Sequence, residues 1–247
     1  MKIAIISDIH GNMQALEAVL EDIKSEKCDK IFCLGDLAMA GPEPVEAIER
    51  IKNLYEAGNF ELIQGNTDAM IGDFNEEVIT KVGSAYPIMF EALKNDVAII
   101  PQSSREFLKK MPKQLELSVE GVKILLVHGS PRKNDENISP DLPINKVEEM
   151  LEGTNADLVL CGHTHIPCGY QTSKKQTVVN DGSVGRPFTT TPQACYAIID
   201  VSNGSFEVMH KFVDYDNKKA SEILAKRDFK GADKLAKILI KPEFRHM

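Results

Sequence analysis

Apolar residues recur along the first part of the chain in runs that alternate between the spacing of strands and that of helices. Continuous or periodic apolar positions predict a strand over Lys2–Ser7, a helix over Met13–Glu26 and a second strand over Lys30–Leu34. A further helix is predicted over Glu43–Ala57, with prolines at its start, and a short strand over Glu61–Gln64. This order is a βαβ arrangement, so the sheet begins parallel or mixed.

The second half of the chain carries shorter apolar runs. Buried strands are predicted over Val122–Val127 and Asp157–Cys161, with a short helix over Asn145–Leu151 between them. After Gln176 the pattern predicts successive strands joined by turns, mainly as a meander. These strands cover Thr177–Asn180, Ala194–Val201 and Ser205–Val213.

Two segments have helical spacing without strands. Between Gln64 and Gln114 no segment has the pattern of a strand, and helical patterns recur near 76–82, 86–93 and 104–111. We interpret residues from about 72 to 112 as a helical insertion. Residues from about 217 to 240 combine apolar positions with many lysines and predict one or two amphipathic helices. The expected fold class is α/β (α+β), with residues 1–247 as a single domain.

Composition and charge narrow the class of function. The chain has 247 residues, of which 43% are hydrophobic and 27% charged, which excludes a disordered or fibrous protein. The net charge of -8 makes stable nucleic-acid binding unexpected, because such proteins neutralise phosphates with basic residues. A small phosphorylated substrate can still bind through a local cation. The oligomeric state stays open.

The cysteines and the N-terminus indicate a cytoplasmic protein. The 5 cysteines are odd in number, and several lie in buried apolar runs, so we interpret them as reduced thiols. The first apolar run ends at Asp8 and is too short for a signal peptide or a membrane span. No membrane partner is expected.

Polar side chains that can bind metals follow the ends of several predicted strands. They are Asp8, His10, Asp36, Asn66, His128, His163 and His165. In open α/β sheets, sites form beyond the carboxyl ends of the strands, so these side chains can converge on one place. Imidazole and carboxylate suit Zn, Mn or Fe, and the set is larger than one ion needs. Two ions about 3.5 to 4 Å apart suit phosphoryl chemistry.

Glycines precede three of these residues. Gly35, Gly65 and Gly162 each stand directly before a candidate ligand. We expect them to allow the sharp turn by which a strand presents the side chain that follows.

The ordered motifs DxH, GD, GN, H and GHxH resemble the calcineurin-like metallophosphoesterase family. The segment GSVGRP at Gly182–Pro187 resembles one found in its small bacterial and archaeal phosphodiesterase branch. The resemblance covers residues 1 to about 200, apart from the insertion. It implies a four-layered αββα sandwich, which agrees with the elements predicted above.

The resemblance also implies a ligand set and a reaction. Asp8, His10 and His165 would hold the first metal, Asn66, His128 and His163 the second, and Asp36 would bridge them. The implied cofactors are two divalent ions, among Mn, Fe, Zn, Ni and Mg, with Mn the first choice. Metal-activated hydroxide would then attack phosphorus, with Asp36, Asn66 and His128 as the catalytic residues. The expected reaction is hydrolysis of a phosphodiester or phosphoanhydride bond.

One position departs from the wider family. Where many members have a histidine after the GN motif, as proton donor to the leaving group, this chain has Thr67. A threonine hydroxyl is a poor general acid near pH 7. A leaving group that needs no proton, such as a nucleotide phosphate leaving from an anhydride, is therefore favoured. This indicates nucleotide-like substrates or dinucleoside polyphosphates.

Several residues keep two interpretations. Arg132 and Arg186 either present a guanidinium to a substrate phosphate or face solvent on their loops. Asp68 either orients a histidine ligand or caps the helix that follows, and the cap is favoured. The aromatic residues and Met89 of the insertion either form a small core of the insertion or provide a surface on which a base stacks, and the core is favoured. The lysine-rich C-terminal helix is expected to be a solvated face.

Three other functions compete with this interpretation. A phosphomonoesterase or protein phosphatase can use the same scaffold. A non-catalytic interaction protein can retain the fold, although such proteins usually lose metal ligands. A metal amidohydrolase also carries an HxH pair, but the chain lacks the repeated βα alternation of a barrel.

Overall fold

The computed structural model describes residues 1–242, and within them the strands form two five-stranded sheets. The first sheet has the order β10-β9-β1-β2-β3, with parallel pairing among β1, β2 and β3 and antiparallel pairing of β9 with β1 and β10. Its strands are β1 (Lys2–Ile6), β2 (Lys30–Cys33), β3 (Phe60–Leu62), β9 (Ala194–Ser202) and β10 (Ser205–Val213). The mixed sheet predicted from the βαβ start is confirmed.

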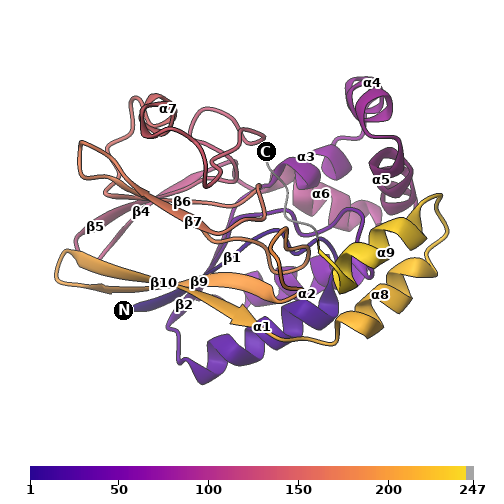
Figure 1. The fold of residues 1–247 in the computed structure, drawn as a ribbon, viewed down its shortest axis with the longest axis horizontal. Helices are drawn as coiled ribbons and strands as arrows, with labels where there is room; N and C mark the ends of the chain where they lie inside the picture. The colour runs from indigo at the N-terminus through magenta and orange to yellow at the C-terminus, as the bar shows by residue number, and fades with distance from the viewer. Residues whose placement is uncertain (243–247) are drawn as a thin grey trace.

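The second sheet has the order β4-β5-β6-β8-β7. Its strands are β4 (Leu115–Val119), β5 (Val122–Leu126), β6 (Leu158–Cys161), β7 (Cys168–Gln171) and β8 (Thr177–Asn180). Strands β5, β6 and β8 are parallel, and the two edge strands are antiparallel to their neighbours. In Figure 1 the two sheets lie one above the other, with helices on the outer sides.

Alternation along β1 shows why the sheets form two inner layers. Ile3 and Ile5 point into the core between the sheets, together with residues of β5 and β6. Ala4 and Ile6 point to the opposite face, where they join the core beneath the helices. Successive side chains of a strand point to opposite faces, so a continuous apolar run supplies both cores.

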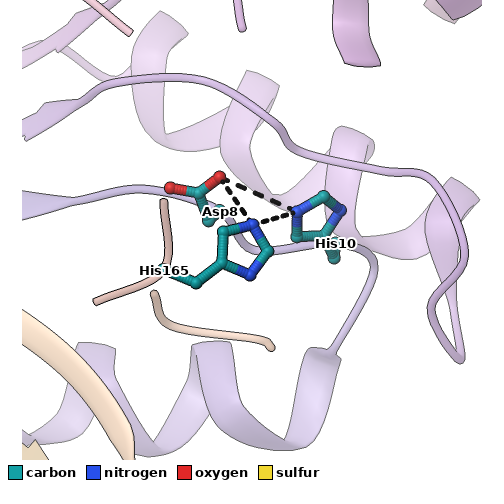
Figure 2. Close-up of side chains that lie close together, drawn as sticks. All are labelled: Asp8, His10 and His165. Carbon is teal, nitrogen blue, oxygen red and sulfur yellow. Dashed lines mark hydrogen bonds and ion pairs between the residues drawn. The ribbon is translucent and has the colours of Figure 1, made fainter. Parts of the chain in front are cut away.

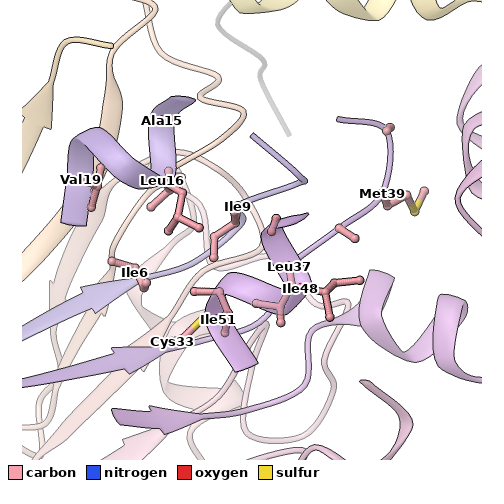
Figure 3. Packing of buried hydrophobic residues seen from close by; sticks show 14 of the residues in the cluster. Ile6, Ile9, Ala15, Leu16, Val19, Cys33, Leu37, Met39, Ile48 and Ile51 are labelled. Carbon is pink, nitrogen blue, oxygen red and sulfur yellow. The ribbon is translucent and has the colours of Figure 1, made fainter. Parts of the chain in front are cut away.

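Helices cover the outer face of each sheet. On the first sheet, α1 (Met13–Ser25) and α2 (Pro44–Glu56) pack against β1 and β2, and Figure 3 shows Leu16 and Ile48 in this core. The helix α7 (Ile144–Met150) buries Val147 against the outer face of the second sheet. The order helix, sheet, sheet, helix confirms the expected αββα sandwich.

The insertion is helical throughout, as predicted. It comprises α3 (Asn66–Gly72), α4 (Glu76–Ala85), α5 (Pro87–Ile99) and α6 (Gln102–Lys110). Leu93 and Leu108 are fully buried in the same core as α1 and α2, so the insertion is packed onto the sandwich and has no separate core. The helix α3 was not predicted, because it is short and begins directly at a candidate ligand.

The predicted meander is wrong for its first strand. β8 lies in the second sheet, parallel to β6, and only β9 and β10 form a hairpin in the first sheet. The edge strands β4 and β7 were missed. Both alternate between half-buried and exposed positions, so neither has the apolar run that identified the central strands.

The C-terminal helices α8 (Asn217–Ala225) and α9 (Ala232–Ile240) pack on the first sheet and the insertion. Arg227, between them, donates to Gly41 O at 2.7 Å and to Asp96 Oδ1 of α5 at 2.5 Å. No helix within residues 1–242 has the length and apolar character to cross a membrane. The cysteines all lie in the described part of the chain, and all are free thiols.

Candidate metal centre

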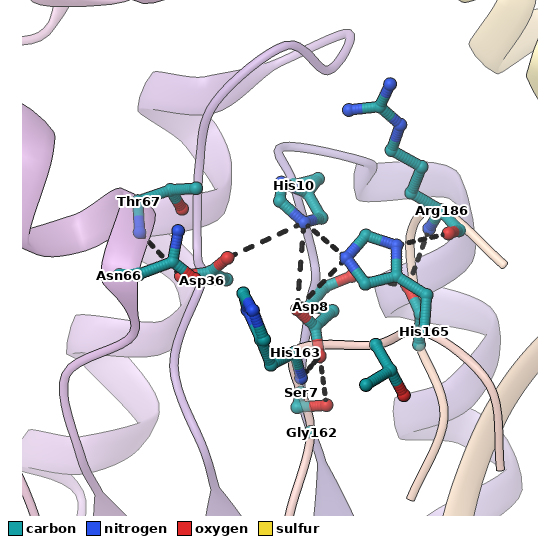
Figure 4. A network of polar contacts seen from close by, with 12 residues as sticks. Ser7, Asp8, His10, Asp36, Asn66, Thr67, Gly162, His163, His165 and Arg186 are labelled. Carbon is teal, nitrogen blue, oxygen red and sulfur yellow. Dashed lines mark hydrogen bonds and ion pairs between the residues drawn. The ribbon is translucent and has the colours of Figure 1, made fainter. Parts of the chain in front are cut away.

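The polar residues that follow the strands lie together at one end of the sandwich (Figure 4). Loops after β1, β2, β3, β5 and β6 contribute to this cluster. The structure brings together all of the predicted ligands, which are Asp8, His10, Asp36, Asn66, His128, His163 and His165. The residue types and their strand-end positions were sufficient to predict this convergence.

Asp8 lies at the centre of the cluster and is fully buried. Its Oδ1 lies 3.2 Å from His165 Nε2, 3.7 Å from His10 Nε2 and 4.0 Å from His128 Nε2, and Figure 2 shows the first two rings turned toward it. This oxygen has no hydrogen-bond partner among residues 1–242. Its Oδ2 accepts from Ser7 Oγ at 2.7 Å and from the His163 N–H at 2.9 Å.

Three of the histidine rings turn their Nε2 atoms toward this carboxylate. The Nδ1 atoms of His10, His128 and His165 lie 3.0, 2.7 and 2.6 Å from the carbonyl oxygens of Met39, Leu34 and Arg186. A carbonyl only accepts, so each Nδ1 carries a proton, and when the ring is neutral its lone pair is on Nε2.

These lone pairs need a cation between them. The Nε2 atoms of His10 and His165 are 3.1 Å apart, and no hydrogen lies between two neutral rings of this tautomer. Together with the orphaned Asp8 Oδ1, they form a buried set of acceptors that lacks a donor. Two imidazoles and a carboxylate are a donor set suited to a first-row divalent metal ion. The residues present therefore fit a metal at this position.

A second group shares the centre through Asp36. The Oδ1 of Asp36 lies 3.4 Å from His128 Nε2, and its Oδ2 lies 3.8 Å from His10 Nε2. Asn66 Oδ1 lies 3.0 Å from His128 Nε2, and the His163 ring centroid is 5.3 Å from that of His128. The Asp36 carboxylate thus stands between the two groups, where a bridging ligand would be placed.

The pKa values of two neighbouring histidines in this cluster shift in opposite directions. Burial lowers the pKa of His128, but the carboxylates of Asp36 and Asp8 outweigh it and raise the value to about 10. Burial and the neighbouring His128 lower the pKa of His163 to about 4.

The ligands sit on strained backbone. Asp8, His10, Asp36, His163 and His165 all have positive φ angles, between 45° and 70°. Side chains other than glycine rarely adopt this region, and such residues concentrate at functional sites. No pattern in the sequence predicts this strain.

The glycines before the ligands serve two different purposes. Gly35 has a φ of +95°, so it makes the sharp turn that we expected. Gly65 does not, since its φ is -83°. A Cβ on Gly65 would lie 2.0 Å from Asp36 Oδ1, and one on Gly162 would lie 2.7 Å from Asp8 Oδ2. These two glycines are required by the close approach of the carboxylates.

The first turn of α3 holds Asp36 in place. Asp68 accepts from the backbone N–H groups of Gly65, Asp36 and Leu37 at 2.7 to 2.9 Å. Asp68 is thus a helix cap, as favoured, but of α3, the helix that contains it, and it also fixes the loop that carries Asp36. Burial and the Asp36 charge raise the pKa of Asp68 to about 7. Thr67 donates its backbone N–H to Asp36 Oδ1 at 2.9 Å.

The GSVGRP segment fixes the loop after β1. The N–H groups of Val184 and Gly185 donate to Ser7 O and Asp8 O, both at 3.0 Å. The hydroxyl of Ser183 also donates to Asp8 O, at 2.9 Å. A Cβ on Gly185 would lie 1.7 Å from a backbone oxygen of this loop, so only glycine fits there. The segment therefore acts as a backbone clamp.

The metal centre opens into a cavity of about 740 Å³. Most of the candidate ligands line its floor, together with Thr67 and Arg186. These ligands are His10, Asp36, Asn66, His163 and His165. Residues of α4, α5 and α9 form the walls, so the insertion overhangs the candidate metal centre. The C-terminal helix α9 is more than a solvated face, because Lys234, Leu235 and Ile238 line the cavity.

The two candidate arginines differ. Arg186 lines the cavity, and Figure 4 shows its side chain extending past His165. Arg132 is exposed and forms a bidentate ion pair with Glu136. Among residues 1–242, it is not one of the residues that line the cavity. The expected phosphate contact therefore has structural support at Arg186 only.

These features define a protein with a candidate metal centre, made of two groups of possible ligands, at the carboxyl ends of the strands of a two-sheet sandwich. A sequence model of the calcineurin-like phosphoesterase superfamily domain matches residues 1–204, so the chain belongs to this superfamily. Over 241 residues it is 32% identical to an uncharacterised protein of Methanocaldococcus jannaschii, covering 91% of this chain and 92% of that protein.

Solved structures share the whole architecture. A hypothetical protein from Pyrococcus horikoshii superposes with a TM-score of 0.87 at 26% identity, covering 99% of both chains. A metallophosphoesterase from Sphaerobacter thermophilus superposes with a TM-score of 0.79 at 24% identity, covering 97% of this chain and 98% of that one. The second likeness shows the fold. The helices beyond residue 204 thus lie outside the superfamily domain but inside the shared fold.

Proposed function

We propose that this protein hydrolyses phosphodiester or phosphoanhydride bonds with two divalent metal ions, of which Mn is the first choice. Asp8, His10 and His165 would hold one ion and Asn66, His128 and His163 the other, with Asp36 as bridge. The observation that carries the proposal is the buried Asp8 Oδ1, which has no hydrogen-bond partner among residues 1–242 and faces the Nε2 atoms of three histidines.

The proposed roles of the chain follow from its contacts. When bound, two divalent ions supply a nucleophile at neutral pH and positive charge for the phosphoryl oxygens. The backbone N–H of Asp36 donates to the Asp68 carboxylate, and the Asp36 carboxylate accepts from the Thr67 N–H. The orientation of Asp36 is therefore set before substrate arrives. Arg186 lines the same cavity and would place a guanidinium against a substrate oxygen.

The position of Thr67 supports a substrate with a good leaving group. Its hydroxyl is buried and donates to Ala38 O at 3.0 Å, so it is already engaged away from the metal ligands. A hydroxyl in this role is not a general acid near neutral pH. Dinucleoside polyphosphates and diesters with an activated leaving group, such as an aryl oxide, need little protonation of that group. They therefore fit this site better than alkyl phosphomonoesters.

The test uses purified protein reconstituted with Mn, with metal content measured for each sample. Turnover is compared for a nitrophenyl phosphodiester, the matching phosphomonoester and a dinucleoside polyphosphate. Metal-dependent turnover that is faster for the diester and the anhydride supports the proposal. Faster turnover of the monoester would identify a phosphomonoesterase instead. Full metal occupancy without turnover of any phosphate ester or anhydride would identify a binding protein that retains the fold.

A further inference from the structure

The cavity beyond the metal centre is built by two segments that are distant in sequence. The end of α4 and the start of α5 contribute Val82, Ile88 and Met89, and α9 contributes Leu235 and Ile238. The two segments are in contact, because a Cβ on Gly231, which precedes α9, would lie 2.7 Å from the Ile88 side chain. Together they form one wall that faces the metal ligands across the cavity. We call this set of five residues the apolar wall.

The apolar wall has the character of a binding surface for an organic group. Leu235 and Val82 are buried, whereas Ile88, Met89 and Ile238 are half-buried and remain open to the cavity. Removing apolar surface from water is favourable, so a ligand group that fills this space gains affinity from each of them. Phosphate and metal ions make no use of such a surface.

The part of the wall that α9 contributes lies outside the matched domain. The superfamily domain ends at residue 204, whereas α9 begins at Ala232. The extension is fixed by Arg227, whose guanidinium bonds Gly41 O and the buried carboxylate of Asp96. A helix held rigidly over the site, outside the domain that supplies the metal ligands, is placed to select the substrate.

The charged residues Lys81, Asp135 and Lys234 also line the cavity, and several of the other lining residues suit a flat ring with a polar edge. Tyr86, at the helix junction, lines the cavity with its side chain 65% exposed, so its ring is available for stacking. Met39, Met70 and Met89 add thioethers, which contact aromatic rings favourably. Asn137 offers an amide that can pair with ring heteroatoms. An aliphatic chain would use neither the amide nor the ring.

We propose that the apolar wall binds the nucleobase of a nucleotide ester or anhydride, whose phosphorus lies at the metal centre. This rests on the proposed function and specifies its substrate class. Ile88, Met89, Leu235 and Ile238 are then specificity-determining residues. Burial of a base-sized group favours substrates that carry a base by roughly 10- to 100-fold over those that lack it.

The test compares substrates that share one leaving group, so that the chemical step is the same. The metal-loaded protein is assayed with the p-nitrophenyl esters of methyl phosphate, hexyl phosphate and thymidine 5′-phosphate. We expect kcat/KM for the thymidine ester to exceed that of the methyl ester by 10-fold or more. Ile238→Trp, which fills the cavity, should reduce this preference at least 10-fold.

A matched control lies on the same helix. Ile240 is 41% exposed and is not part of the cavity lining, so Ile240→Trp should leave the preference unchanged. Equal kcat/KM for the thymidine and methyl esters would overturn the proposal. A hexyl ester as good as the thymidine ester would overturn the nucleobase and assign the wall to an alkyl chain. A preference for the thymidine ester that Ile238→Trp does not change would also overturn the proposal.

A binding measurement separates this proposal from the proposed function. Calorimetry on the metal-loaded protein compares thymidine 5′-phosphate with methyl phosphate, and no turnover is needed. Tighter binding of the nucleotide by 10-fold or more, lost in Ile238→Trp, supports the apolar wall even if no ester is cleaved. Equal binding of the two phosphates, together with normal turnover of the methyl ester, would overturn the apolar wall and leave the proposed function intact.

Discussion

Replacing Arg227 by methionine tests how the C-terminal extension is held to the site. Methionine keeps much of the length of the side chain but leaves the Asp96 carboxylate, which is fully buried, without its ion-pair partner. The guanidinium also bonds Gly41 O and Asn95 Oδ1, at 2.7 and 2.6 Å. Removing one partner of a buried pair costs roughly 3 to 5 kcal/mol, a large share of a typical stability of about 5 to 15 kcal/mol.

The loss should depend on pH, and its sign follows from the pKa of Asp96. Burial raises this pKa even though Arg227 opposes the shift. The charged carboxylate therefore costs stability, and this cost is absent at low pH and grows as pH rises through the folded-state pKa. Without Arg227 the pKa rises further. The difference between wild type and variant should therefore be largest at pH 7.5 and at least about 1 kcal/mol smaller at pH 5.

Urea unfolding at the two pH values, under identical metal loading, measures this difference. Arg50→Met is the matched control, because Arg50 pairs with Glu17 at 2.6 Å on the surface, with 37% and 49% of the two side chains exposed. It should cost less than about 1 kcal/mol. The double variant Arg227→Met/Asp96→Asn should recover much of the loss, since it buries no charge. A loss below about 1 kcal/mol in Arg227→Met, or an equal loss at both pH values, would refute the reasoning.

Three further variants test the centre itself. Asp36→Asn should remove most turnover and lower metal content, because the bridging carboxylate offsets the charge of both ions. Elemental analysis and a nitrophenyl diester assay measure the two effects. Unchanged metal content and turnover would contradict the dinuclear assignment. Arg186→Met should raise KM by roughly 10-fold or more, as expected for loss of a hydrogen bond from a charged group, whereas Arg132→Met should not change it. Thr67→His, if metal content is unchanged, should raise the hydrolysis rate of diesters with alkyl leaving groups by roughly 10² and leave that of nitrophenyl diesters nearly unchanged. The measurement is the slope of log rate against leaving-group pKa. Equal slopes in both proteins would show that another group already donates the proton.

The sequence was sufficient to place the ligands because their positions follow from strand ends. Runs such as Lys2–Ile6 and Leu158–Cys161 are apolar on both faces and were recognised without ambiguity. Their carboxyl ends must meet at one edge, and the polar residue that follows each run is then fixed in space. This local logic also gave the helical insertion and the hairpin of β9 and β10.

Long-range packing could not be predicted in the same way. That α9 forms a wall of the cavity depends on how Arg227 and Gly231 contact residues more than 100 positions earlier in the chain. Hydrophobic periodicity showed which face of this helix is buried but not against what. The same limit applies to Arg132 and Arg186, which have similar positions after motifs, yet only Arg186 reaches the cavity.

The clamp at Gly182–Pro187 explains how a strained site can exist before any ion binds. Left-handed backbone at a residue other than glycine costs about 1 to 3 kcal/mol, and several ligands share this conformation. Such strain persists only where surrounding contacts fix the backbone. Here the N–H of Asp8 bonds Gly35 O, the N–H of His10 bonds Asp36 O, and Ser183, Val184 and Gly185 hold the same loop from the other side. The ligand positions are thus set by hydrogen bonds of the backbone, so the free energy of metal binding need not be spent on arranging them.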